Sequence, residues 1–122
     1  MDTAAFLKAY NEGRNGANLF VRHSLARSFQ YSDGVRDCAE AGLYWLIDIA
    51  ATELPQVIPL GDLGILTFKV LGGRGDLKLE IQDDVPPAWE RHIDLTDAPD
   101  GTWLFYIANE GERFAMILAS EY

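Results

Sequence analysis

Cysteine and long apolar runs are both scarce in this chain. Cys38 is the only cysteine of the 122 residues, so no internal disulfide can form and a reducing compartment is expected. No run of about 18 apolar residues is present to span a bilayer, and the N-terminus lacks the basic start and apolar stretch of a signal peptide. We therefore expect a cytoplasmic protein without a membrane segment.

Basic side chains are also few in this chain. Ten Lys and Arg stand against nineteen Asp and Glu, which gives a formal net charge of −9. This charge repels nucleic-acid phosphates, so it argues against direct nucleic-acid binding and favours a basic partner. The stretch from Gly13 to Ser32 is the exception, because it contains no acid and holds Arg14, Arg22 and Arg27. It is the one region that is suited to face phosphate.

Residues 76–100 are, by contrast, strongly acidic. The acids that we predict to form a protein-binding surface are Asp76, Glu80, Asp83, Asp84, Glu90 and Asp94. They lack the spacing and the glycine of an EF-hand loop, so we expect neither a metal site nor another cofactor. The prediction is a solvated acidic edge that docks on a basic protein surface, with electrostatic steering of the encounter.

The N-terminal half has the apolar spacing of helices. The first helix is expected to be capped by Asp2 or Thr3 and to run to Asn11. A longer helix is expected from an N-cap at residue 32 or 33 to about Thr52. Length and composition indicate that these helices belong to a single domain over residues 1–122.

For two residues of the longer helix, Cys38 and Gly42, the sequence also predicts a structural role. Cys38 lies on its apolar stripe, where a thiol stays protonated and inert, so we expect a core residue rather than a nucleophile. Gly42 precedes the most apolar part of the helix and permits a bend or a close contact.

From Gly64 onward the apolar period changes to two, which is typical of strands. Strands are predicted at residues 66–70, 77–81, 89–95, 103–108 and 113–119. A glycine-rich hairpin over residues 72–76 joins the first two strands through positive φ angles. The fold class is therefore α+β, with two or three N-terminal helices packed on one face of an antiparallel meander of about five strands.

The segment before the longer helix is an alternative binding site, for a small ligand. Its candidate residues are His23, Arg27, Tyr31 and Asp33, with His23 and Asp33 as an acid–base pair and Arg27 as a clamp for an anion. No nucleophile stands in a recognisable context, so no catalytic residue is predicted. The competing interpretation of His23 is a structural or partner-contacting histidine.

Aromatic side chains recur in the predicted strands, where sheet proteins can stack bases. The members are Trp89, Trp103, Phe105, Tyr106 and Phe114. Such a platform needs basic companions, whereas acids are interleaved here, so core and cross-strand packing is the better account.

Four short segments carry a family resemblance: His23-x-Leu25-x-Arg27, Tyr31-Ser32-Asp33-Gly34-Val35, Tyr44-Trp45-Leu46-Ile47-Asp48 and Ser120-Glu121-Tyr122. The pattern resembles a family of small bacterial, plasmid and phage proteins classed as a domain of unknown function. The resemblance implies a mobile-element context and no established activity or cofactor. By analogy, it suggests a stoichiometric inhibitor of a host nucleic-acid-handling defence system, of the anti-CRISPR or anti-restriction type, rather than an enzyme. The oligomeric state is left open.

Overall fold

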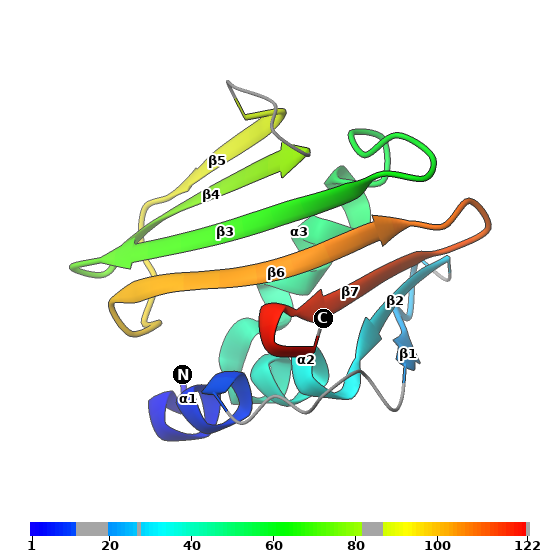
Figure 1. Ribbon diagram of the computed structural model, residues 1–122. Coiled ribbons are helices and arrows are strands. Elements are labelled where there is room, and N and C mark those ends of the chain that lie inside the picture. The colour runs from blue at the N-terminus through cyan, green and yellow to red at the C-terminus, as the bar shows by residue number, and fades with distance from the viewer. Residues whose placement is uncertain (12–19, 27, 82–86, 122) are drawn as a thin grey trace.

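The structure is a computed structural model that describes residues 1–11, 20–26, 28–81 and 87–121 (Figure 1). The helical elements are α1 (Thr3–Asn11), α2 (Asp33–Cys38), the π-helical turn η1 (Ala39–Leu43), α3 (Tyr44–Glu53) and the final 3-10 turn η2 (Ala119–Glu121). The strands are β1 (Phe20–Arg22), β2 (Phe29–Ser32), β3 (Leu63–Leu71), β4 (Arg74–Ile81), β5 (Trp89–Ile93), β6 (Gly101–Asn109) and β7 (Phe114–Leu118). They form one seven-stranded sheet in the order β1-β2-β7-β6-β3-β4-β5.

Period-two burial builds the sheet and orients it toward the helices. In β3, Leu66, Phe68 and Val70 are buried, while the intervening Lys69 is exposed. The same alternation buries Leu77, Leu79, Ile81, Trp103, Phe105, Ile107, Phe114, Met116 and Leu118. Figure 1 shows the helices on one side of the sheet. The buried side chains of the strands belong to one hydrophobic core together with those of the helices. The α+β class, the helix-covered face and the packing role of the strand aromatics Trp103, Phe105 and Phe114 are therefore confirmed.

Residues 33–53 form a helical rod that is broken at a glycine. Ser32 caps its start, since its hydroxyl accepts a hydrogen bond from the Val35 amide at 3.2 Å. Gly42 has a φ of 132°, which a side chain rarely adopts, and Met1 packs against it. The bend expected at Gly42 is thus confirmed. Of the helices that the structure describes, none has the length and apolar character needed to cross a membrane.

An aromatic cluster fixes α1 against the sheet. Phe6 and Tyr10 each meet the ring of Trp103 edge-on, with ring centroids 5.0 Å apart in both pairs. The Tyr10 hydroxyl also accepts a hydrogen bond from the Leu104 amide at 2.9 Å. These contacts hold α1 beside β6 and place it next to α2.

The predicted five-stranded antiparallel meander is wrong in its topology. Strand β6 pairs with β3 instead of β5, and β2, which was not predicted, pairs with β7 in parallel, with Phe29 opposite Phe114. Phe29 and Tyr31 are buried with period two, but four residues are too short for this period to stand out among polar neighbours. Strand β1 extends the same edge of the sheet and pairs with β2 in the antiparallel direction.

Candidate functional site

A cleft of about 450 Å³ lies between α1, the start of α2 and the final turn η2. This volume is within the range of roughly 300–1,000 Å³ that is common for ligand sites. We call it the acidic cleft, because the charged residues that line it are Asp2, Lys8, Asp33, Asp37, Glu40 and Glu121. Five carboxylates therefore face one amine among the lining residues that the structure describes.

The carboxylates reach the cleft from three parts of the fold. Asp33, Asp37 and Glu40 follow each other at spacings of four and three residues, so they share one face of the helical rod. Asp2 caps α1, since its carboxylate accepts a hydrogen bond from the Ala5 amide at 3.0 Å. Glu121 comes from the opposite end of the chain. Of these five residues, sequence reasoning had selected only Asp33 as a binding residue.

Glu121 forms the buried end of the acidic cleft. Its exposed fraction is 4%, and its Oε1 accepts hydrogen bonds from the Ser32 hydroxyl at 2.5 Å and from the Leu118 amide at 2.9 Å. No residue in the described part of the chain hydrogen-bonds its Oε2. Gly34, which also lines the cleft, makes room for this carboxylate, because a Cβ atom there would lie only 2.7 Å from Oε2.

The acids predicted to bind a protein lie elsewhere, on the far side of the sheet. Asp76, Glu80 and Glu90 lie on the face of β4 and β5 that the helices do not cover, which we call the open face, and Asp94 follows β5. The predicted residues Asp83 and Asp84 lie outside the residues that the structure describes.

Basic side chains are interleaved with the acids of the open face. Strand pairing sets Lys69 opposite Asp76 and Lys78 opposite Glu90. Directly opposite residues on one face have Cβ atoms about 5 Å apart, so these charges offset one another. The two nitrogens of His92 also contact Asp76, at 2.9 Å, and Asp94, at 3.2 Å. The open face is a surface of mixed charge, whereas the acidic cleft is a concentration of one sign.

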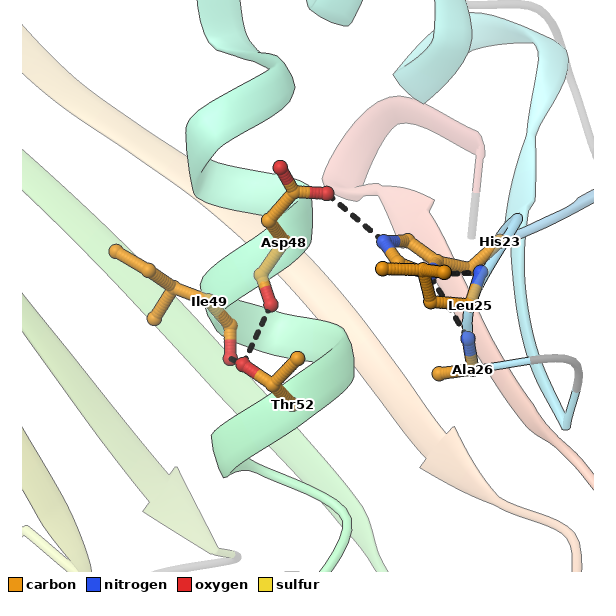
Figure 2. A network of polar contacts seen from close by, with 6 residues as sticks. All are labelled: His23, Leu25, Ala26, Asp48, Ile49 and Thr52. Carbon is orange, nitrogen blue, oxygen red and sulfur yellow. Dashed lines mark hydrogen bonds and ion pairs between the residues drawn. The ribbon is translucent and has the colours of Figure 1, made fainter.

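His23 of the predicted ligand site holds a turn instead. Its Nε2 lies 2.8 Å from a carboxylate oxygen of Asp48, and its Nδ1 accepts hydrogen bonds from the amides of Leu25, at 3.2 Å, and Ala26, at 3.0 Å (Figure 2). Because two amides donate to Nδ1, the proton of the neutral ring is on Nε2 and points to Asp48. Both ring nitrogens are therefore engaged without Asp33, the partner that we predicted.

The other three residues of the predicted ligand site are not gathered around His23. Tyr31 is buried under the helices, and this burial, followed by the nearby Tyr44 and Asp48, raises the pKa of its hydroxyl. Asp33 lines the acidic cleft, which neither His23 nor Tyr31 lines. Arg27 lies outside the described residues.

Cys38 lies close to the acidic cleft but in the core. Its exposed fraction is 1%, and burial, with further contributions from Asp37 and Glu121, raises the pKa of its thiol to about 12. This confirms the prediction of a core thiol. Across the described ranges, no group of three or more His, Cys, Asp or Glu side chains is arranged to hold a metal ion.

The fold and the cleft together define a small α+β protein with a cleft between α1, α2 and η2 whose charged lining is mainly acidic. The chain belongs to a family of unknown function, DUF6876, whose sequence profile matches residues 7–122, and this confirms the family resemblance. The chain is also similar to a protein of unknown function from Enterococcus faecalis, known from a crystal structure. The two are 26% identical with a TM-score of 0.53, over 85% of this chain and 98% of that one. No curated protein matches the chain.

Proposed function

We propose that this protein is a binding module that performs no turnover and docks a basic protein partner in the acidic cleft. One observation carries the proposal. Glu121 is buried at the end of a cleft lined by further carboxylates, and its Oε2 receives no hydrogen bond from the described residues. Because Oε1 already accepts two hydrogen bonds, Oε2 is the oxygen of Glu121 that can form a charge-assisted hydrogen bond with a positively charged donor that enters the cleft.

The two charged surfaces have different parts in this proposal. Carboxylates at the mouth of the cleft, such as the exposed Glu40, attract a basic partner over a distance that salt shortens. Glu121 contributes at close range, where burial strengthens a charge-assisted hydrogen bond. The open face attracts such a partner less, because Lys69 and Lys78 lie among its acids.

A pair of matched double variants tests the proposal with octalysine as the probe of a basic surface. Asp37→Asn with Glu40→Gln neutralises the mouth of the cleft, and Glu80→Gln with Glu90→Gln makes the same change of charge on the open face. Binding is followed by calorimetric titration at low salt and at physiological salt. We expect the cleft variant to lose about tenfold in affinity, since two favourable charges are removed, and the open-face variant to lose less than about threefold.

Equal losses of affinity in the two variants would show that octalysine responds only to the net charge of the protein, and the proposal would then fail. A larger loss in the open-face variant would restore the surface predicted from the sequence. The further expectation, that the partner is a host defence enzyme that handles nucleic acid, stays a prediction. Inhibition of a purified enzyme of this class by the wild-type protein, and not by the cleft variant, is its test.

A further inference from the structure

We infer that the buried end of the acidic cleft receives the ammonium group of a lysine side chain of the partner, in preference to an arginine guanidinium. The inference rests on the proposed function and names the chemical group that this function recognises. Its basis is the unequal environment of the two carboxylate oxygens of Glu121.

One oxygen of Glu121 is already saturated. A carboxylate oxygen has two lone pairs, and Oε1 uses them for the Ser32 hydroxyl, at 2.5 Å, and the Leu118 amide, at 2.9 Å. Oε2 accepts nothing from the described part of the chain. Glu121 therefore offers a cation one acceptor atom instead of two.

A single acceptor discriminates between the two basic side chains. The strongest pairing of a guanidinium with a carboxylate uses two parallel N–H donors, one to each oxygen, and Oε1 is not free to accept the second. An ammonium is a compact charge with three donors in separate directions. One N–H can donate to Oε2 while the other two stay hydrated, and the exposed carboxylates of the cleft attract the charge at longer range.

The access to Oε2 depends on the absence of a side chain at Gly34. A Cβ atom at this position would lie 2.7 Å from Oε2 and 2.9 Å from Oε1, so any larger residue displaces the carboxylate or covers it. Gly34 lies in α2 and has no positive φ, so its backbone alone does not require glycine. The absence of a side chain at Gly34 is thus explained by the need to keep the Glu121 carboxylate in place and Oε2 accessible.

A divalent metal ion fits the cleft less well than an organic cation. Ca²⁺ requires six to eight oxygen ligands at about 2.4 Å, and Mg²⁺ a near-octahedral set. The carboxylates of the cleft are spread around about 450 Å³, and in the described residues no three acidic, histidine or cysteine side chains converge on one point. This spread suits a long side chain whose charge lies at its tip.

The test compares three peptides that differ at one central position and are otherwise neutral. The position is lysine, arginine or acetyl-lysine, and free spermidine is titrated beside them. We expect the lysine peptide to bind wild-type protein at least about fivefold more tightly than the arginine peptide, and the acetyl-lysine peptide not to bind.

Two variants of the protein locate the site. Glu121→Gln keeps an oxygen for Ser32 and Leu118 but places an N–H donor where Oε2 was, so the affinity for the lysine peptide should fall by at least about tenfold. Glu90→Gln is the control with the same chemical change on the open face and should bind as wild type. If Glu121→Gln does not fold, Gly34→Ala covers the same oxygen and should give the same loss.

The possible results separate this inference from the proposed function. If the arginine peptide binds as tightly as the lysine peptide, or if Glu121→Gln and Gly34→Ala bind normally, the inference is overturned while the matched octalysine experiment can still succeed. Spermidine that binds more tightly than the lysine peptide would also overturn it, because the ligand would then be a free polyamine. Failure of the octalysine experiment removes the proposed function itself.

Discussion

The acidic cleft and the open face contain similar numbers of carboxylates but differ in what lies between them. In the cleft, the lining residues that the structure describes include one amine, that of Lys8. On the open face, strand register brings a lysine opposite Asp76 and another opposite Glu90. The two regions show that an acidic stretch of sequence becomes an acidic surface only when the pairing of secondary structure keeps the cations away from it.

Burial is the second difference between the two regions. Glu121 has an exposed fraction of 4%, while the side chains of Asp76 and Asp94 are more than half exposed. Exposed pairs contribute little to stability because water and salt screen them. The buried Glu121 carboxylate accepts two hydrogen bonds and so contributes to the stability of the fold, and in the proposed function it also contacts the partner.

Truncation of the buried carboxylate should have the largest effect on stability. Glu121→Ala leaves the Ser32 hydroxyl and the Leu118 amide without their acceptor, and we expect the free energy of unfolding to fall by about 3 kcal/mol. Glu90→Ala on the open face should change it by less than about 0.5 kcal/mol. Urea denaturation of both variants measures the difference. Equal stabilities would show that the buried carboxylate of Glu121 stabilises the fold no more than the exposed one of Glu90.

The two histidines give a second matched pair. His23 is buried and accepts two backbone amides, whereas the His92 side chain is about half exposed between Asp76 and Asp94. We expect His23→Ala to lower the free energy of unfolding by about 2 kcal/mol, because the amides of the turn lose their acceptor. His92→Ala should cost less than about 0.5 kcal/mol. A His92 variant as unstable as the His23 variant would contradict this interpretation.

The thiol of Cys38 provides a third comparison, through pH. Its pKa is raised from 9.0 to about 12 in the folded protein by burial and by the charges of Asp37 and Glu121. Because the folded state holds this proton more tightly, the stability linked to it is complete below pH 9 and is lost as the pH rises toward 12. Cys38→Ala should therefore flatten the alkaline loss of stability, as measured by urea denaturation between these pH values.

The same thiol can report on the charge of the cleft. Glu121→Gln removes one of the charges that raise the pKa of Cys38, so alkylation by iodoacetamide at alkaline pH should become faster, by less than about tenfold since burial remains the main cause. Glu80→Gln on the open face should leave the rate unchanged. An unchanged rate in both variants would place the charge of Glu121 too far from the thiol to matter.

Much of the fold was predictable because its signals are local. The apolar alternation in β3 and β4, the bend at Gly42 and the positive φ angles of Gly72 and Gly73 each follow from a few neighbouring residues. The parallel pairing of β2 with β7 was not predictable in this way, since it joins segments from opposite halves of the chain. Strand β2 is also too short, at four residues, to show the period-two alternation of a strand.

The candidate site was predictable only in part, because some of its features are local in the sequence and others join distant residues. The shared helical face of Asp33, Asp37 and Glu40 is a local pattern that the sequence contained and that our reasoning did not use. The partnership of Glu121 with Ser32 spans 89 positions, and that of His23 with Asp48 spans 25. Spacing along the chain does not reveal such pairs, although all four residues lie in the segments that carry the family resemblance.

The parallel contact between β2 and β7 has a consequence for the order of folding. It closes a loop that contains most of the polypeptide, so it forms against a larger loss of chain entropy than the neighbouring hairpin of β3 and β4. The turn η2 follows β7 directly and brings Glu121 to the helices. We therefore expect this pairing to form late in folding, and in the proposed function the cleft can receive a partner only after the final strand has docked.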